Sequence, residues 1–288
     1  MRDGSPPVLV LGATGRVGGE IVANLVANGR NVRAATRRAR ESDLEGVEYV
    51  PFDLTSPATW SRALDGVMSL FLMWPPGTTP EKNVFPFLEL AKSSGVERVV
   101  FLSVLGADTM TFLPHAKIEA RIQKLAFSFA FLRAGYFMQN FSTMHADDII
   151  ERNEIALPAG NGRLCMVDVT DVGAAGATAL VDVHDNVAWD LTGPDPLSMA
   201  DVAQKLTVAL GRPIRHRKLG ALRFFWEQIR RGQSTGLVLF MVAEYTHARM
   251  HKAARKGDGV QLALGRPPTS FEGFAVREQS SWAVSDDG

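Results

Sequence analysis

The sequence predicts an α/β fold: a doubly wound parallel sheet with helices on both faces, followed by a smaller α+β part. Short apolar runs of strand length alternate with helical patterns through the first half of the chain, which is typical of a parallel sheet. The chain has 288 residues, 46% of them hydrophobic and 22% charged, as in an ordinary globular protein. A chain of this length can bury a sizeable core in one large domain, or in one domain with a smaller partner.

The elements of the first half follow from the spacing of apolar residues. The expected strands are 8–11, 31–35, 47–51, 67–73, 98–102 and 127–132. Helices are expected at 18–28, 85–94 and 115–125, and residues 59–64 are expected to begin another helix. The strand-like runs are mostly apolar without alternation, as expected for strands buried on both faces.

The alternation loosens after about residue 141. The second half predicts strands at 154–157, 163–166 and 186–191, and helices at 168–180, at 198–210 and twice within 219–250. We therefore expect a dinucleotide-binding sheet domain over 1–141, to which 160–185 return, and a substrate-binding part that is mainly 142–288. The apolar and aromatic helices within 219–250 either wall a pocket or pack as plain core.

Composition excludes several classes of protein. The 31 Lys and Arg residues balance 31 Asp and Glu residues, so no global charge points to nucleic acid or to a membrane surface. Cys165 is the only cysteine, which excludes an intramolecular disulfide and a cysteine-based zinc cluster, and we expect no metal. No apolar run reaches ~18 residues, and the N-terminus lacks an apolar export segment. We expect a cytoplasmic protein, and the sequence leaves monomer and homodimer open.

The most informative segment is Val8–Gly18, where an apolar strand runs into three glycines and then into a helix. The spacing G-x-x-G-x-x-G permits a sharp turn and brings free backbone N–H groups at a helix N-terminus to a pyrophosphate. A tight strand-to-helix turn without a ligand is the alternative. The expected cofactor contacts in this loop are Gly12, Thr14, Gly15, Arg16, Val17 and Gly18.

The end of the second strand indicates which dinucleotide binds. A site for NAD(H) usually carries an acidic residue there, but this chain has Arg37 and Arg38, whose guanidinium groups suit a 2′-phosphate. NADP(H) is therefore favoured over NAD(H), with a solvated basic loop as the alternative because Arg40 continues the run. Asp53 and Leu54 fit an adenine-edge contact, although an aspartate at a strand end is also a common turn residue.

The proton-donating pair of many short-chain reductases is missing. Those enzymes use Tyr-x-x-x-Lys, but Tyr49, Tyr136 and Tyr245 are not followed by lysine at that spacing. The candidates near the expected place are Ser103, as a hydrogen-bond partner of a substrate oxygen, and His115, as a general acid or a ribose contact. A histidine at a helix start can equally well serve only to cap or to pack.

Two further segments follow strands at the edge where ligands bind in parallel sheets. Met73 and Trp74 begin a proline-rich loop, in which both residues are expected to contact the cofactor and Trp74 to pack on a flat substrate. Tyr136, Phe137 and Asn140 follow the sixth strand and are expected to bind substrate. Tyr136 is also a catalytic candidate as a hydrogen-bond donor, since without a lysine its pKa stays near ~10. Packing is the alternative for each.

These residues resemble the NmrA-like group of atypical short-chain dehydrogenase/reductases. That group includes NADPH sensors, quinone reductases, triphenylmethane-dye reductases and ergot-alkaloid reductases. The matching segments are Gly12–Gly18, Arg37, Asp53-Leu54, Ser103–Ala107, His115-x-x-x-Glu119, Leu132–Asn140, Leu264–Arg266 and Phe271–Phe274. The resemblance implies a Rossmann-type sheet of order 3-2-1-4-5-6 with a seventh strand. It also implies that the C-terminal part covers the nicotinamide end.

Two functions are compatible with these patterns. The first is an NADPH-dependent oxidoreductase that transfers hydride to a planar aromatic or conjugated acceptor, such as a quinone, imine or enone, in a secondary-metabolite pathway. Such acceptors need only modest acid assistance, which fits the missing Tyr–Lys pair. The second is a non-catalytic NADP(H) sensor that acts through a protein partner. The apolar, aromatic C-terminal part favours the enzyme with a small aromatic substrate.

Overall fold

A computed structural model describes residues 5–38, 44–75, 77–181, 186–250 and 253–283. The chain divides into two compact units, each made of segments that are distant in sequence. Unit 1 comprises Met1–Ala134, Val169–Leu191 and Asp258–Arg266. Unit 2 comprises Gly135–Asp168, Thr192–Gly257 and Pro267–Gly288.

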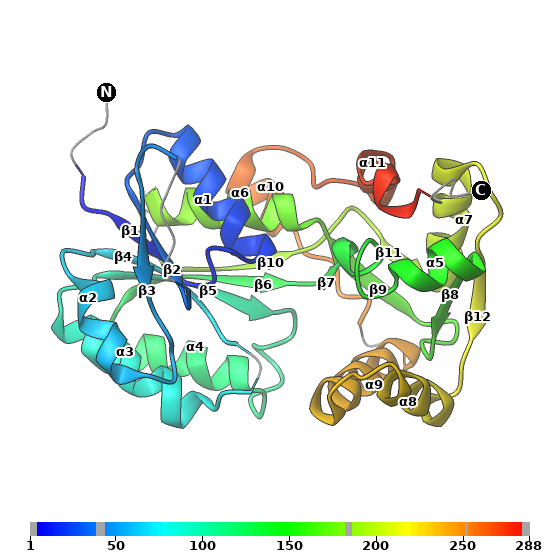
Figure 1. Cartoon of the computed structure of the whole chain (residues 1–288), viewed down its shortest axis with the longest axis horizontal. Helices are drawn as coiled ribbons and strands as arrows, with labels where there is room; N and C mark the ends of the chain where they lie inside the picture. The colour runs from blue at the N-terminus through cyan, green and yellow to red at the C-terminus, as the bar shows by residue number, and fades with distance from the viewer. Residues whose placement is uncertain (1–4, 39–43, 76, 182–185, 251–252, 284–288) are drawn as a thin grey trace. The chain divides into compact units, whose positions relative to one another are not determined.

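Unit 1 is built on a seven-stranded sheet of order β10-β6-β5-β4-β1-β2-β3 in which every neighbouring pair is parallel (Figure 1). Its strands are β1 (Val8–Val10), β2 (Val32–Thr36), β3 (Val47–Pro51), β4 (Ser69–Met73), β5 (Arg98–Val104), β6 (Ser128–Ala134) and β10 (Val187–Leu191). This arrangement confirms the expected order 3-2-1-4-5-6 and identifies β10 as the seventh strand.

Helices cover both faces of this sheet (Figure 1). One face carries α1 (Arg16–Ala27), α6 (Val169–Val181) and α10 (Gly259–Leu264). The other carries η1 (Pro57–Thr59), α2 (Trp60–Leu64), the π-helical turn η2 (Pro80–Val84), α3 (Phe85–Ser93) and α4 (Pro114–Lys124). Because both faces are covered, most residues of the strands are apolar, as expected for a buried parallel sheet. The doubly wound α/β prediction is confirmed.

The core under α2 and α3 is aromatic. The Phe87 ring meets Phe52 and Trp60 edge-on, with ring centroids 5.3 and 5.5 Å apart. All three side chains are buried, and edge-to-face packing adds to the hydrophobic free energy of their burial. This packing holds the end of β3, and with it the turn at Asp53, firmly against the sheet.

Unit 2 contains two small sheets and five α-helices among its described residues. One sheet joins β11 (Pro196–Ser198), β9 (Arg163–Val167) and β7 (Tyr136–Phe137), and the other pairs β12 (Arg215–Lys218) with β8 (Glu154–Leu157). The helices are α5 (Ala146–Arg152), α7 (Met199–Leu210), α8 (Ala221–Arg230), α9 (Thr235–Arg249) and α11 (Phe271–Arg277), with the 3-10 turns η3 (Met138–Asn140) and η4 (Gln279–Trp282).

The unit bounds differ from the expected domain ranges for a local reason. We expected the sheet domain to run to residue 141, but unit 1 ends at Ala134 because β7 pairs with β9 of unit 2. We expected 160–185 to return to the sheet, whereas 169–191 do so, since β9 at 163–167 belongs to unit 2. Asp258–Arg266 also return, because α10 packs on α6 and β10.

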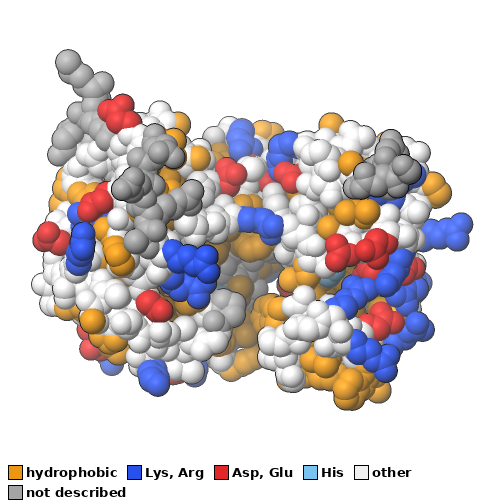
Figure 2. Space-filling view, in the orientation of Figure 1, with side chains coloured by type: hydrophobic (Ala, Val, Ile, Leu, Met, Phe, Trp, Pro, Cys, Tyr) orange, Lys and Arg blue, Asp and Glu red, His pale blue; other side chains and the backbone are white. Residues whose placement is uncertain are grey.

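The two helices expected within 219–250 are present as α8 and α9, and part of their apolar surface faces solvent. Figure 2 shows hydrophobic side chains at the surface over this hairpin. Leu222 and Trp226 of α8 are 80% and 58% exposed, and Leu239 and Phe240 of α9 are each 56% exposed. Phe224 and Tyr245 are buried in the core of unit 2. Across the described ranges, no helix combines the length and the apolar character needed to cross a bilayer.

Candidate dinucleotide site and its surroundings

The glycine loop connects β1 to α1 in unit 1. Gly12 adopts a left-handed φ of +66°, and Gly15, the residue that precedes α1, has its N–H bonded to the Gly12 carbonyl oxygen at 2.8 Å. No described side chain caps the N-terminus of α1. Thr14, Gly15 and Arg16 are exposed there, so the first helical turn presents backbone N–H groups and a positive dipole end. An anion such as a pyrophosphate fits this end of the helix.

The loop lies at the point where the strand order of the sheet reverses. Strands β1 and β4 are neighbours, and from them the chain winds outward in opposite directions. In such sheets ligands bind outside the carboxyl ends of the strands at this point. Met73 ends β4 beside Gly12, and a Cβ atom at Gly12 would overlap the Met73 sulfur. The expected contacts in the glycine loop and at Met73 and Trp74 therefore lie at one edge of one sheet.

Arg37 and Arg38 follow β2 and are exposed, as a role toward a bound anion requires. Arg40 lies outside the described residues. Asp53 follows β3, where its Oδ1 accepts hydrogen bonds of 2.7 Å from both the backbone N–H and the hydroxyl of Thr55. These bonds, with the nearby Arg37 charge, lower the pKa of Asp53. Asp53 is thus a turn residue in this structure, and Leu54 beside it is buried.

Ser103 is tied to a buried ion pair. Its hydroxyl donates to Glu119 Oε1 at 2.6 Å, and Arg133 donates to both Glu119 oxygens at 3.1 and 2.7 Å. Ser103 and Glu119 are buried, and Asp108 lies 3.9 Å from Arg133. The Ser103 proton is therefore directed to Glu119 in this structure, and the expected bond from Ser103 to a substrate oxygen stays a prediction. Helical spacing places Glu119 on the same face as His115, but no pattern in the sequence brings Arg133 to Glu119.

His115, in the first turn of α4, packs between aromatic rings. Its ring is perpendicular to Trp74 with centroids 5.2 Å apart, and it lies 6.0 Å from Phe101. Burial lowers the pKa of His115 to about 4. The imidazole is therefore neutral near pH 7 and can still hydrogen-bond, and the expected role of His115 as a general acid or ribose contact stays a prediction.

In unit 2, Tyr136 is part of a buried polar triangle. Its hydroxyl lies 2.9 Å from His145 Nε2 and 2.8 Å from the Tyr245 hydroxyl, and these two partners are 3.0 Å apart. All three side chains are buried. Burial raises the pKa of Tyr136 above its ordinary value and lowers that of His145 to about 4. Tyr136 is therefore a neutral hydrogen-bonding group near pH 7, and its expected roles in catalysis and substrate binding stay predictions.

The residues around this triangle include Asn140, which was expected to bind substrate, and others that the sequence did not indicate. Asn140 in η3 hydrogen-bonds Tyr136, while Phe137 of β7 is half-buried. Glu244, next to Tyr245 on α9, has its pKa raised to about 7 by burial. The helical spacing of Val238, Met241 and Tyr245 indicates the buried face of α9, but no pattern in the sequence brings His145 to it.

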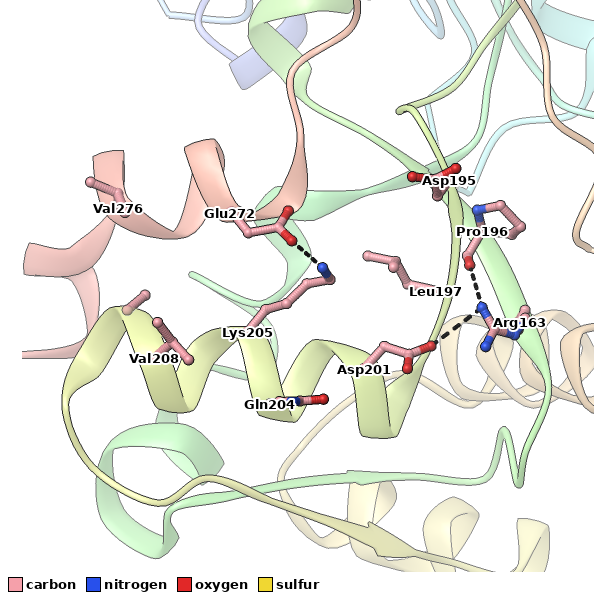
Figure 3. Close-up of a pocket in the computed structure, with 11 residues that line it drawn as sticks. Arg163, Asp195, Pro196, Leu197, Asp201, Gln204, Lys205, Val208, Glu272 and Val276 are labelled. Atoms are coloured by element: carbon pink, nitrogen blue, oxygen red, sulfur yellow. Dashed lines mark hydrogen bonds and ion pairs between the residues drawn. The ribbon is translucent and has the colours of Figure 1, made fainter.

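A pocket of about 460 Å³ in unit 2 lies beside α7 and α11 (Figure 3). Its charged side chains are already paired. Lys205 contacts Glu272, and Arg163 lies 3.5 Å from Asp201 and donates to the Pro196 carbonyl at 2.9 Å. This pocket therefore offers no free charge to a ligand. Within the described ranges, no three His, Cys, Asp or Glu side chains are grouped to hold a metal ion.

Known proteins are similar to this chain in sequence and in fold. The NAD(P)H azoreductase of Xenophilus azovorans is 31% identical over 286 residues, covering 96% of this chain and all of the relative. The Citrobacter sp. triphenylmethane reductase, crystallised with NADP(H), superimposes with a TM-score of 0.80 at 20% identity, covering 95% of this chain and 99% of its own. The NADPH-dependent quinone oxidoreductase of Escherichia coli, crystallised with NADPH, gives 0.83 at 20% identity, covering 94% and 99%.

The family model called "NmrA-like family" matches residues 5–258. The match begins before the glycine loop and ends near the start of α10, so it includes the carboxyl edge of the sheet and most of unit 2. This chain belongs to the NmrA-like family.

Proposed function

We propose that this protein transfers hydride from NADPH to a planar aromatic or conjugated acceptor, such as a quinone, an imine or an enone. The protein is an NAD(P)H-dependent oxidoreductase of the NmrA-like, atypical short-chain type, with NADP(H) as cofactor. The observation that carries the proposal is the uncapped N-terminus of α1 at the reversal point of the sheet. There the glycine loop leaves room for a pyrophosphate, as in other dinucleotide-binding sheets.

The exposed pair Arg37 and Arg38 supports NADP(H). Both side chains follow β2, where a dinucleotide's adenosine ribose is recognised in this fold. A guanidinium group makes charge-assisted, fork-shaped hydrogen bonds to phosphate. Asp53 on the neighbouring strand end accepts two hydrogen bonds from Thr55, and its carboxylate would repel a phosphate, so the arginines are the groups suited to bind a 2′-phosphate.

The class of acceptor is supported by the named relatives and by the acid groups. Azo compounds, triphenylmethane dyes and quinones are conjugated, and each takes up hydride into an electron-poor system. Their reduction needs little help from a strong acid. The candidates here fit such chemistry, because His115 is neutral at pH 7 and Tyr136 holds its proton tightly.

The test is anaerobic NADPH oxidation by the purified protein with a panel of quinones, azo compounds, triphenylmethane dyes, imines and enones. We expect turnover with at least one class and a lower KM for NADPH than for NADH. NADPH affinity is measured separately by titration calorimetry. Tight binding of NADPH without turnover of any acceptor would refute the proposed enzymatic activity.

A second candidate is a non-catalytic NADP(H) sensor. It is favoured by one specific observation, the absence of the Tyr–Lys pair together with the use of the Ser103 proton by Glu119. In that case NADPH and NADP+ would differ in affinity or in their effect on the protein, with no acceptor reduced. Comparing the two cofactors in the same calorimetric titrations separates the two functions.

A further inference from the structure

The indole N–H of Trp74 is a buried donor that has no hydrogen-bond partner among the described residues. Tryptophan can only donate through this atom, so the missing acceptor cannot be replaced by another arrangement of the same group. Buried donors are normally satisfied, and an unsatisfied one is an exception that needs an explanation. Trp74 itself is half-buried, so part of the side chain is accessible while the nitrogen is not.

Three other tryptophans of this chain have a hydrogen-bond acceptor or access to water. Trp60 donates to the Asp53 carbonyl oxygen at 3.0 Å, and Trp282 donates to the Phe141 carbonyl oxygen at 2.8 Å. Trp226 is 58% exposed, so water is available to it. The unsatisfied indole of Trp74 is therefore a feature of its place in the fold and not of tryptophan in this protein generally.

That place is the carboxyl end of β4, next to Met73 and the reversal point of the sheet. The chain beyond it is held by local hydrogen bonds. Thr78 donates to the Pro75 carbonyl oxygen at 2.8 Å, and the Thr79 N–H donates to Asn83 Oδ1 at 3.1 Å. These bonds restrain the described residues on the C-terminal side of Trp74.

The surroundings of Trp74 favour a hydrogen bond from its indole N–H to an acceptor. The His115 ring stands at 90° to the indole, and Phe101 lies on the other side of His115. Because His115 is neutral at pH 7, no positive charge competes with the indole for an acceptor oxygen. Hydrogen bonds strengthen in such poorly solvated surroundings.

We propose that the Trp74 indole N–H binds a carbonyl oxygen of the reacting ligands. The oxygen belongs either to the acceptor, as in a quinone or an enone, or to the carboxamide of the nicotinamide. This inference rests on the proposed function and adds a polar role to a residue that otherwise offers only a flat apolar surface. In both cases one hydrogen bond forms and no covalent bond changes.

The substitution Trp74→Phe keeps an aromatic ring and removes the donor. The matched control is Trp226→Phe, at the exposed tryptophan of α8. Kinetics are measured with 1,4-naphthoquinone, which has carbonyl groups, and with crystal violet, which has none, and the Kd of NADPH is measured by calorimetry. We expect Trp74→Phe to lower either kcat/KM or the affinity for NADPH about tenfold, equivalent to about 1.4 kcal/mol.

The pattern of that loss identifies the oxygen. A quinone carbonyl predicts a tenfold lower kcat/KM for naphthoquinone only, with crystal violet and the NADPH Kd unchanged. The carboxamide predicts a tenfold weaker NADPH affinity and an equal loss with both acceptors. Unchanged values for naphthoquinone, crystal violet and NADPH would overturn the proposal.

A measurement that does not depend on turnover separates this inference from the proposed function. The chain has five tryptophans, and in an 15N–1H spectrum the indole signal missing from Trp74→Phe belongs to Trp74. We expect this signal to move downfield on addition of NADP+ or of NADP+ with naphthoquinone, while the Trp226 signal stays. If the protein reduces no acceptor, the proposed enzymatic activity fails, but the shift is still observed with NADP+ alone or with NADP+ and naphthoquinone. A signal that stays in place with both additions would refute the donor role.

Discussion

Gly18 packs so closely on Gly12 that a Cβ atom at Gly18 would overlap the Gly12 carbonyl oxygen. The contact fixes the first turn of α1 against the loop that enters it. Gly12 is in turn pressed against Met73, where a Cβ atom would overlap the sulfur. The glycines therefore position the helix N-terminus as well as making room for a ligand.

The substitution Gly18→Ala is expected to disrupt this contact. Overpacking against backbone typically costs about 1–3 kcal/mol, and the displaced loop should also weaken NADPH binding. The matched control is Gly19→Ala, whose new Cβ atom would lie 3.7 Å from the Ala13 carbonyl oxygen, an ordinary contact. Gly19→Ala is expected to stabilise α1 by about 0.5–1 kcal/mol. Urea unfolding and calorimetric titration with NADPH measure both effects, and equal behaviour of the two variants would contradict the packing role.

Arg37→Ala with Arg38→Ala is expected to reduce the preference for NADPH over NADH. Charge-assisted hydrogen bonds contribute about 1.5–3 kcal/mol, so the NADPH Kd should rise by roughly 10- to 100-fold while the NADH Kd changes little. Arg62→Ala, at an exposed arginine of α2, controls for the general loss of positive charge. An unchanged ratio of the two affinities would show that neither arginine recognises the 2′-phosphate.

Ser103→Ala is expected to lower stability and to leave turnover intact. The substitution leaves a buried Glu119 oxygen without its 2.6 Å hydrogen bond, which should cost about 1–2 kcal/mol. Ser93→Ala is the control, because the Ser93 hydroxyl makes only an exposed bond of 3.0 Å to the Leu90 carbonyl oxygen. The free energy of unfolding in urea and the kcat with an identified acceptor are measured for both variants. A tenfold lower kcat at unchanged stability would instead make Ser103 a substrate contact.

His145 should make the protein less stable as the pH falls. Its pKa is about 4 in the folded protein and about 6.5 in an unfolded chain, so between these values the unfolded state binds more protons. The free energy of unfolding is thus unaffected by His145 above about pH 6.5. It falls as the pH approaches 4, by on the order of 3 kcal/mol in total.

The variant His145→Gln should flatten this slope, because glutamine does not titrate. Losing the bonds to Tyr136 and Tyr245 lowers stability at every pH, so the slope and not the absolute value is the readout. His247→Gln, at a half-buried histidine on α9, is the control. Urea unfolding between pH 4.5 and 7.5 measures the slope, and an unchanged slope in His145→Gln would refute the assignment.

Much of unit 1 was predictable because its signals are local. Strand β3 was expected at the bounds observed, and the helices α1, α3 and α4 within two residues of theirs. Strand β7 and helix α5 were not expected, because two paired residues and a seven-residue helix carry too little periodicity. The strands at 154–157 and 163–166 were expected as elements, but only the structure shows that they pair with β12 in one case and with β11 and β7 in the other.

The sequence by itself determined the α/β class, the glycine loop and the missing Tyr–Lys pair, since each depends on spacing along the chain. Only the tertiary structure decided which side chains retain a free polar group. It placed the Ser103 hydroxyl on Glu119, enclosed Tyr136 with His145 and Tyr245, and gave the Trp74 indole N–H no acceptor among the residues that the structure describes. The physical reason is that burial and hydrogen-bond partners come from residues that are distant in sequence. The pKa values and available donors that govern chemistry therefore follow from packing.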